Sequence, residues 1–278
     1  MKKGNAVYVW TKANIFDDTE FVEICKQFDV SNVFLSAYNT RKTSEASAQF
    51  STFNMFCTAN NLDVYAMAST NEFALNHRIA LEYIDDIVAF NDSVGETQRF
   101  KGIHFDIEPY CLPQYQEGSE EDKMVVWKNY LDMTVKSFQK SKENGIEFGL
   151  SIPYWLKLGN RVGIDINLDG NMKPVSYHII DNSDHVSIMA YRNEPGHVVE
   201  AVGDEIIYAE DRNIETGSFH YSENPNKNVF VAVEDLSMMP KVVEIMDFLY
   251  KDFSSYAGIA IHPYRNLRDV VKKRENVK

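Results

Sequence analysis

The sequence has few cysteines, no long hydrophobic run and a deficit of basic residues, and each absence excludes a class of protein. Three cysteines occur among 278 residues, and the odd number and wide spacing of Cys25, Cys57 and Cys111 exclude a disulfide framework and match no metal-site spacing. No stretch approaches the roughly 18 consecutive apolar residues of a membrane-spanning helix, so we expect no membrane insertion. Lys and Arg number 28 against 41 Asp and Glu, and the net charge of −13 disfavours nucleic acid as a partner.

Targeting and cofactor signals are missing as well. The amino terminus shows no apolar segment before a small-residue cleavage site, so we expect no signal peptide. A cytoplasmic protein and an exported or cell-surface protein trimmed of its export signal would look the same, which leaves the compartment open. Gly-rich phosphate loops, nucleophile elbows and Cys–His dyads do not occur, and we expect no cofactor. The composition, 44% hydrophobic and 25% charged, is that of a globular protein.

Short runs of β-branched and aromatic residues alternate with longer amphipathic runs along the whole chain. Strands that alternate with helices indicate βαβ crossovers, and eight such units predict one α/β domain over residues 1–278, a (β/α)8 TIM barrel. The predicted helices cover 18–28, 45–60, 74–93, 121–143, 197–212, 239–253 and 266–277. The predicted strands cover Ala6–Trp10, Asn32–Ala37, Asp63–Ser69, Gly102–Glu108, Glu147–Pro153, His185–Tyr191, Asn228–Glu234 and Gly258–Pro263.

One insertion interrupts this rhythm between Tyr154 and Ser176. Its segment 165–170 matches the first half of a calcium-binding loop, but Ser176 stands where such a loop needs a bidentate glutamate. Alternating apolar residues followed by Asp169-Gly170, a tight-turn pair, favour a β-hairpin instead. We therefore predict a β-hairpin insertion after the fifth strand.

Strand parity places polar side chains at one end of the predicted barrel. Side chains alternate along a strand, and the apolar row Ile103, Phe105 and Ile107 is expected to face the helices. The opposite rows then point inward and end at the carboxyl ends of the strands, where barrel enzymes carry their chemistry. The last inward-facing residues are Trp10, Ser36, Ser69, Asp106, Glu108, Pro153, Tyr191, Glu234 and His262.

The segment Gly102–Tyr110 is the central motif. Asp106 and Glu108 are two residues apart on a predicted strand, so both project into the same cavity. Neighbouring carboxylates repel each other when both are ionised, which raises one pKa and keeps that group protonated near neutral pH. A protonated Glu108 at the barrel mouth is suited to protonate a leaving oxygen as a general acid. The alternative is a structural carboxylate pair bonded to the backbone or to an arginine.

Three segments resemble glycoside hydrolase family 18, the chitinase-like barrels. Gly102–Tyr110 resembles the family's fourth-strand Asp-x-x-Asp-x-Asp-x-Glu, Ser187–Tyr191 its sixth-strand Met-x-Tyr, and Leu150–Pro153 its fifth-strand stretch. The resemblance implies that Glu108 is the proton donor, that Asp106 orients a substrate acetamido group, and that Tyr191 hydrogen-bonds the intermediate. The sequence departs from the family at three places: the first two aspartates fall on Lys101 and His104, and the eighth-strand tryptophan is replaced near His262.

Glu234 offers a second scheme, because it ends the predicted seventh strand. Many retaining glycosidase barrels place their two carboxylates at the ends of strands four and seven, about 5–5.5 Å apart when one is a nucleophile. The sequence leaves two roles for Glu234 equally open. It is either the nucleophile or one partner of a rim ion pair with Arg192 or Arg265.

His104, Asp106 and Glu108 form an inward-facing ladder that invites a metal ion. The seven histidines show no His-x-x-x-His spacing, so we expect no metal and predict that His104 hydrogen-bonds to Asp106 in the barrel floor.

As a set, the aromatic residues in the predicted loops after the strands suit a carbohydrate, because flat rings pack against the CH faces of sugars. They are Trp10, Tyr110, Tyr115, Tyr154, Trp155 and Tyr264. Any single one of them is better explained by ordinary packing at the rim. The predicted substrate-binding residues are Trp10, Tyr110, Trp155, Arg192 and His262.

These patterns favour a glycoside hydrolase that acts on a polysaccharide or glycoconjugate. The catalytic candidates are Glu108, Asp106, Tyr191 and Glu234. The alternative is a catalytically inactive, lectin-like barrel, which the replaced aspartates favour and the retained Asp106, Glu108 and Tyr191 oppose.

Overall fold

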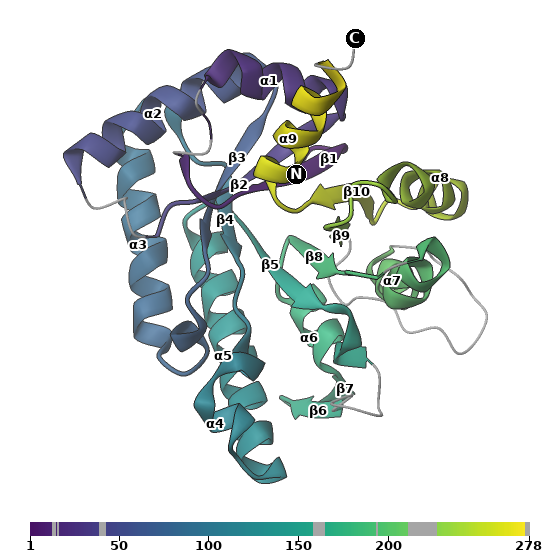
Figure 1. Ribbon diagram of the computed structural model, residues 1–278. Helices are drawn as coiled ribbons and strands as arrows, with labels where there is room; N and C mark the ends of the chain where they lie inside the picture. The colour runs from purple at the N-terminus through teal and green to yellow at the C-terminus, as the bar shows by residue number, and fades with distance from the viewer. Residues whose placement is uncertain are drawn as a thin grey trace.

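Parallel strands form a closed barrel at the centre of the structure, a computed structural model that describes residues 1–12, 15, 17–38, 43–157, 165–192, 194–210 and 227–275. Within that part of the chain, eight strands close in the order β1-β10-β9-β8-β5-β4-β3-β2 (Figure 1). Their bounds are β1 Asn5–Val9, β2 Val30–Ser36, β3 Asp63–Ala68, β4 Gly102–Phe105, β5 Glu147–Pro153, β8 His185–Met189, β9 Asn228–Val233 and β10 Tyr256–Ile261. The predicted (β/α)8 fold is confirmed.

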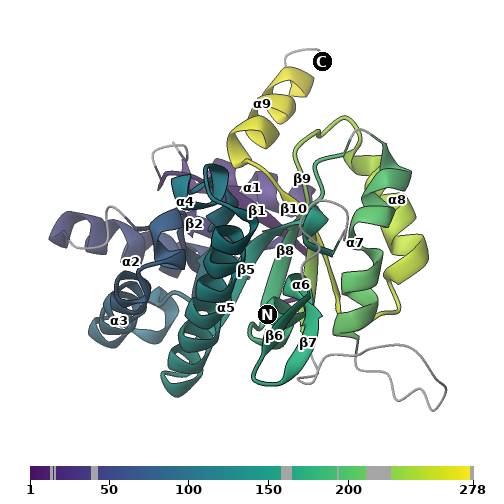
Figure 2. The same cartoon turned by 90° about the horizontal axis from the view of Figure 1, so that it is seen from below.

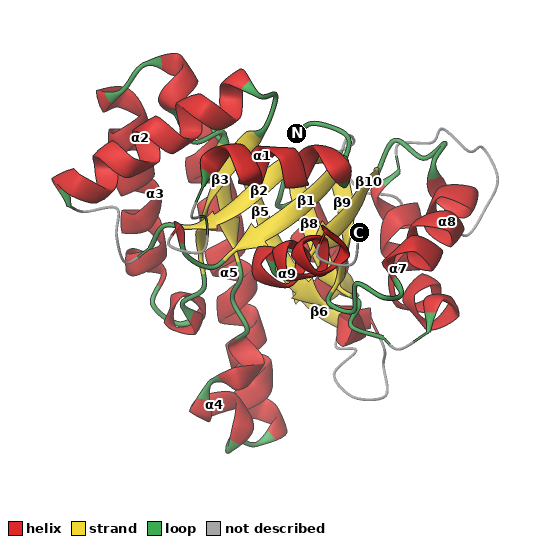
Figure 3. Ribbon diagram, turned by 45° about the horizontal axis from the view of Figure 1, so that its top comes forward, coloured by secondary structure: helices red, strands yellow, loops and turns green. Residues whose placement is uncertain are grey.

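Helices surround this barrel, as the red ribbons around the yellow strands show in Figure 3. Figure 2 shows α2 and α3 on one side and α7 and α8 on the other. The helices are α1 Asp18–Gln27, α2 Ser44–Ala59, α3 His77–Ser93, α4 Pro113–Gln116, α5 Glu120–Glu143, α6 Val175–Asp181, α7 Pro195–Ala209, α8 Met239–Tyr250 and α9 Tyr264–Glu275. The short helices α4 and α6 were not predicted; α6 begins at Val175, where the predicted insertion ends. None of the described helices is long and apolar enough to cross a lipid bilayer.

Helices α1 and α5 begin where short polar side chains satisfy the first N–H groups of the helix. Asp17 accepts hydrogen bonds from the N–H groups of Thr19 and Glu20 at the start of α1. Ser119 and Asp122 form a capping box at the start of α5, in which each side chain accepts from the other residue's backbone N–H.

Successive strand residues face the barrel interior and the outer layer in turn, as the side-chain alternation predicts. Ile103, Phe105 and Ile107 lie in the large core between strands and helices. A separate cluster fills the barrel itself, and in it large rings pack against small residues. Its members are Ala6, Tyr8, Phe34, Tyr65, Met67, Phe230, Ala232, Ala257 and Ala260.

Strand β4 is shorter than predicted. It ends at Phe105, whereas the sequence pattern extended it to Glu108. Pro109 fixes its own backbone at the first position of a 3-10 turn, η4 (Pro109–Cys111), and Glu108 leaves the strand conformation with φ −111° and ψ 79°. The Asp106 N–H still donates to the Ala68 carbonyl at 2.8 Å, so Asp106 continues the line of β4 toward the barrel mouth.

The insertion after β5 contains the predicted β-hairpin. Strands β6 (Asp165–Leu168) and β7 (Asn171–Pro174) pair antiparallel. Asp169 and Gly170 make the turn with positive φ values of 52° and 90°. The carbonyl of Ile166 lies 2.7 Å from Nε2 of the buried His178, which ties the hairpin to α6.

Gly149 provides the first testable prediction. A Cβ at this position of β5 would lie 2.1 Å from Nε2 of His185, inside the barrel. Gly149→Ala is therefore expected to lower the free energy of unfolding by about 1–3 kcal/mol through overpacking, as measured by chemical denaturation. The matched control is Gly196→Ala, since a Cβ added there meets no atom within 4 Å beyond its chain neighbours and the nearby backbone of α7. An unchanged stability of Gly149→Ala would contradict the packing described.

Candidate active site

The predicted site residues gather at the carboxyl ends of the barrel strands. Each follows a strand directly or within three residues: Trp10 after β1, Asp106 and Glu108 after β4, Tyr191 and Arg192 after β8, Glu234 after β9, and His262 after β10. Several of these side chains interact electrostatically with one another. Burial and the nearby charges of Asp106, Glu234 and Glu108 raise the pKa of the Tyr191 phenol.

Three aromatic side chains form one wall of the barrel mouth. The indole Nε1 of Trp10 donates to Nε2 of His262 at 3.0 Å, with the ring planes 88° apart. The ring of Tyr191 lies 5.6 Å from that of His262 and remains 37% exposed, so the phenol is open to a ligand. Burial lowers the pKa of His262 against the raising effect of Glu234 and Glu108, which favours a neutral ring that accepts the Trp10 N–H.

Asp106 is half-buried below the mouth. Its pKa is raised to about 6, first by burial and then by the charge of Glu108, while a hydrogen bond from Ser151 opposes the rise. The sequence predicted that one carboxyl group of the pair has a raised pKa. That group is Asp106, and the main cause is burial rather than repulsion by Glu108. The carboxyl group changes its charge close to neutral pH.

Two residues that the sequence analysis missed hold Glu108. The Glu108 N–H donates to Oδ1 of Asn71 at 2.8 Å, in the 3-10 turn η2 (Asn71–Ala74) after β3. The thiol of Cys111 lies 3.3 Å from Oε2 of Glu108 and donates to it. The sequence contained a signal for Cys111. Pro109 starts a turn directly after Glu108, and such a turn brings the residue three positions after Glu108 back toward it.

The Cys111 contact carries the second prediction. Cys111 is exposed while Cys25 and Cys57 are buried, so a thiol reagent should label native protein once. Burial, the hydrogen bond to Glu108 and its charge raise the pKa of Cys111 to about 11. Glu108→Gln removes the charge, so the pKa should fall and iodoacetamide should alkylate Cys111 several-fold faster at pH 8, because the thiolate reacts. Glu117→Gln, a change at an exposed carboxylate, is the control, and equal rates in both variants would contradict the contact.

The prediction that His104 bonds to Asp106 was wrong. His104 is fully buried inside the barrel, where its Nε2 lies 2.9 Å from Oγ of Ser151 and its Nδ1 lies 3.1 Å from Nε2 of His185. Its ring stacks on Phe34 at 3.9 Å, and this packing turns it toward β5 and β8. Among the described residues, no group of three or more His, Cys, Asp or Glu side chains is arranged to hold a metal ion.

Glu234 is exposed at the rim beside Tyr191 and Arg192. In the described part of the chain it forms no ion pair with Arg192 or Arg265. Arg192 donates instead to the Tyr154 hydroxyl at 2.7 Å, and its guanidinium lies 5.0 Å from the Tyr154 ring. The alternative role of Glu234, a rim ion pair with Arg192 or Arg265, is therefore not found among the described residues.

The loop aromatics divide into two groups. Tyr110 and Trp155 are partly exposed and pack edge to face, with ring centroids 4.9 Å apart. Tyr115 and Tyr264 are 7% and 1% exposed, and they pack against Trp127 and Phe21 in the helical layer. Tyr115 and Tyr264 therefore have the packing role that was expected of any single loop aromatic, and neither was among the predicted substrate-binding residues.

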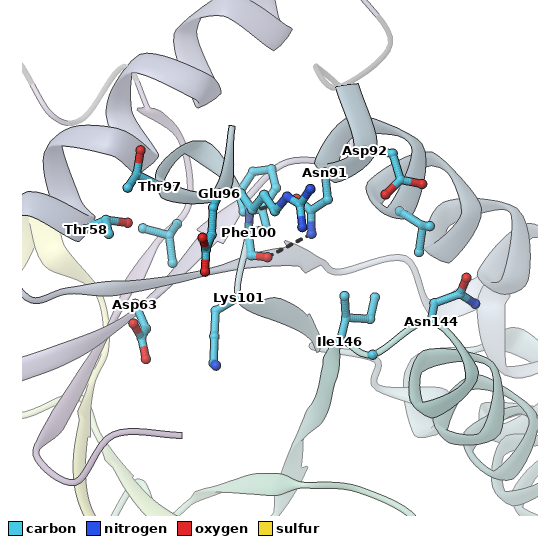
Figure 4. A pocket seen from close by; sticks show the side chains of 14 residues that line it. Thr58, Asp63, Asn91, Asp92, Glu96, Thr97, Phe100, Lys101, Asn144 and Ile146 are labelled. Atoms are coloured by element: carbon cyan, nitrogen blue, oxygen red, sulfur yellow. Dashed lines mark hydrogen bonds between the residues drawn. The ribbon is translucent and has the colours of Figure 1, made fainter. Parts of the chain in front are cut away.

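A hollow of about 450 Å³ lies at the opposite end of the barrel (Figure 4). Asp63, Lys101 and Ile146 line it where β3, β4 and β5 begin. Asn91 closes part of its wall by donating to the Phe100 carbonyl at 2.9 Å. Its position at the amino-terminal ends of the strands separates it from the carboxylates at the mouth.

No family model and no curated protein matches the sequence. Solved structures do match the fold. A family 18 chitinase from Pseudoalteromonas aurantia superposes with a TM-score of 0.56 at 10% identity, over 97% of this chain and 99% of that chain. A spore cortex-lytic enzyme from Bacillus megaterium gives a TM-score of 0.55 at 12% identity, over 95% and 71% of the two chains.

A family 18 chitinase from the chitin utilization locus of Flavobacterium johnsoniae gives a TM-score of 0.51 at 14% identity, over 98% and 93% of the two chains. At such low identities these likenesses establish the fold. The chain has the closed parallel barrel found in family 18 chitinases, so the resemblance of its three motifs extends to its architecture, with strongly diverged sequence.

Proposed function

We propose that this protein is a glycoside hydrolase that cleaves an N-acetylated polysaccharide or glycoconjugate. The observation that carries the proposal is the convergence of Asp106, Glu108 and Tyr191 at the carboxyl end of a barrel with the fold of family 18 chitinases. The strands deliver these side chains from β4 and β8, and barrel enzymes place their chemistry at this end.

In this proposal Glu108 is the general acid. Its carboxyl group protonates the glycosidic oxygen as the bond to the anomeric carbon breaks. The substrate's own acetamido oxygen attacks that carbon and forms a cyclic oxazolinium ion, and water later opens this ion while Glu108 takes back the proton. Asp106 as a carboxylate accepts the acetamido N–H and stabilises its positive charge, and the Tyr191 hydroxyl donates to the acetamido oxygen.

The aromatic residues supply the sugar-binding surface. Trp10 and His262 form a rigid hydrogen-bonded wall beside Tyr191, at the place where family 18 enzymes carry their eighth-strand tryptophan. The pair Tyr110 and Trp155 offers a second apolar face beyond Glu108. Arg192, held by Tyr154, supplies hydrogen-bond donors for sugar hydroxyls at the rim.

A non-catalytic, carbohydrate-binding barrel is the second candidate, and one observation favours it. The positions of the family's first two aspartates carry no carboxylate near Asp106. His104 lies in the barrel interior, and Lys101 lies at the opposite end, 3.5 Å from Glu147.

The test compares a tetra-N-acetylated chito-oligosaccharide with its fully deacetylated counterpart. We expect hydrolysis of the first, detected by mass spectrometry, and none of the second, because only the first carries the attacking acetamido group. Binding of the acetylated sugar without hydrolysis would support the lectin-like barrel. If the protein neither binds nor hydrolyses either sugar, the hydrolase and the lectin-like barrel are both contradicted.

Glu234 separates the substrate-assisted mechanism from a covalent one. With the acetamido group as nucleophile, Glu234→Gln should lower turnover by less than about tenfold, whereas loss of an enzyme nucleophile would abolish turnover even on an activated aryl glycoside. We expect the modest effect, because Glu234 is exposed at the rim. Complete loss of turnover on the activated substrate would contradict this assignment.

A further inference from the structure

The connections that follow β3 and β4 meet at the barrel mouth, where a side chain takes over from the backbone pairing of the two strands. The register of β3 and β4 ends with Ala68 opposite Phe105. The Asp106 N–H then donates to the Ala68 carbonyl at 2.8 Å. Two residues later, the Glu108 N–H donates to Oδ1 of Asn71 at 2.8 Å. Asn71 is the first residue of η2, the turn that follows β3.

The backbone carbonyl that would continue this pairing is committed elsewhere. Bonds to a neighbouring strand recur at every second residue, so Thr70 would follow Ala68 as the next acceptor. The Thr70 carbonyl instead accepts the Phe73 N–H at 3.0 Å and closes the turn η2. The side-chain oxygen of Asn71 therefore stands in for a strand carbonyl at the point where β3 turns away.

The turn η2 is fixed in the core, which makes Asn71 a firm support. Phe73 and Ala74 of this turn are fully buried. The ring of Phe73 lies 5.2 Å from that of Phe105, the last residue of β4, and 6.3 Å from that of Tyr83 on α3. Core packing thus sets the position of η2 relative to β4, and Asn71 passes that position on to the residue beyond the strand.

Glu108 is held at three points once it has left the strand conformation. Its N–H donates to Asn71, its carbonyl accepts the Cys111 N–H at 2.9 Å, and its Oε2 accepts the Cys111 thiol at 3.3 Å. Both contacts with Cys111 lie within the turn that Glu108 itself begins, so they move with it. The contact with Asn71 comes from another connection and fixes this turn relative to β3.

We propose that Asn71 is a positioning residue that fixes the backbone of Glu108 and thereby aims its carboxyl group at the barrel mouth. Without the acceptor, the Glu108 N–H loses its partner and the turn is free to shift, carrying the carboxyl group with it. A misplacement of about 1 Å can cost about 10²-fold in rate. The catalytic consequence rests on the proposed function, whereas the anchoring of Glu108 does not.

Two variants of similar size separate the acceptor from the bulk of the side chain. Asn71→Leu keeps the bulk without an acceptor, and Asn71→Asp keeps an acceptor oxygen. The matched control is Asn76→Leu, on the same connection, since the Asn76 side chain caps no N–H group of α3. If Asn71→Leu does not fold, Asn71→Ala removes the same acceptor and is measured in its place.

Two measurements test the anchor without a substrate. Amide hydrogen exchange of Glu108, followed by NMR, should be about two- to tenfold faster in Asn71→Leu, the worth of one hydrogen bond, and no faster in Asn71→Asp. Alkylation of Cys111 by iodoacetamide at pH 8 should rise several-fold in Asn71→Leu, because a displaced carboxylate no longer holds the thiol proton. Unchanged exchange would overturn the proposal. Faster exchange with unchanged alkylation would also overturn it, since the carboxyl group would then keep its place without the anchor.

Kinetics test the consequence for the acid. In an active enzyme, Asn71→Leu should lower kcat on a natural glycan by about 10- to 100-fold with little change in KM, and far less on an activated aryl glycoside that needs no proton. Asn71→Asp should recover most of this turnover, and Asn76→Leu should lose none. An equal loss on both substrates would show a general disturbance of the site and overturn the positioning role.

The failure of this proposal and that of the proposed function are distinguishable. If the protein cleaves no glycan but exchange and alkylation respond as expected, the proposed function fails and the anchor stands. If cleavage requires Glu108 while Asn71→Leu behaves as the wild type in all three measurements, the function stands and the anchor fails.

Discussion

Replacing Glu108 by glutamine is expected to lower turnover of a natural glycan by about 10²–10⁴-fold, the usual contribution of general-acid catalysis. Glutamine keeps the size of the side chain but has no acidic proton to transfer to the leaving oxygen. The loss should be much smaller on an activated aryl glycoside, whose leaving group departs without protonation. Steady-state kinetics on both substrates measures the difference.

The matched control for this change is Glu117→Gln. Glu117 is an exposed carboxylate beyond α4, so its substitution changes the net charge equally but should leave turnover unaffected. The unfolding midpoint of Glu108→Gln should equal that of the wild type, which separates catalysis from folding. Wild-type turnover of a confirmed natural substrate by Glu108→Gln would contradict the role of Glu108 as the acid.

Asp106→Asn is expected to lower turnover of an acetamido sugar by about 10²–10³-fold, the cost of losing one preorganised electrostatic group. Asparagine cannot stabilise the positive charge that develops on the acetamido nitrogen. Binding should weaken for acetamido sugars more than for plain hexoses. Equal effects on both classes of sugar, measured by calorimetry, would show that no N-acetyl group is recognised at this position.

The pH profile gives Asp106 a second signature. A carboxyl group with a pKa of about 6 is ionised above that pH and protonated below it, so wild-type kcat/KM should fall as the pH drops through 6. This acidic limb should vanish in Asp106→Asn, which has no group to titrate there. Asp252→Asn, at an exposed position after α8, should keep the limb.

Local patterns in the sequence account for most of the fold. Side-chain alternation assigned Ile103 and Phe105 to the outer layer, because a strand has only two faces. The Asp169-Gly170 pair located the hairpin turn, since both residues tolerate positive φ. The end of β4 was misplaced because Asp106 and Glu108 keep the alternation, although Pro109 had already set the chain into a turn.

The partners within the site could not be predicted, because they depend on which rotamers the packed barrel allows. His104 was expected to reach Asp106 along its own strand, yet its ring lies across the barrel against Phe34 and bonds to His185. Gly149 on β5 was the signal that could have shown this, since a glycine in an inward-facing row leaves room for a large ring on the next strand.

The stereochemistry of hydrolysis tests the central claim most directly. In the proposed mechanism, the acetamido group attacks first and water then opens the oxazolinium ion from the opposite face, so the anomeric configuration is retained. Time-resolved ¹H NMR of a β-linked chito-oligosaccharide should therefore show the β-anomer of the new reducing end before mutarotation. Initial appearance of the α-anomer, or no new reducing end at all, would contradict the mechanism assigned to Asp106, Glu108 and Tyr191.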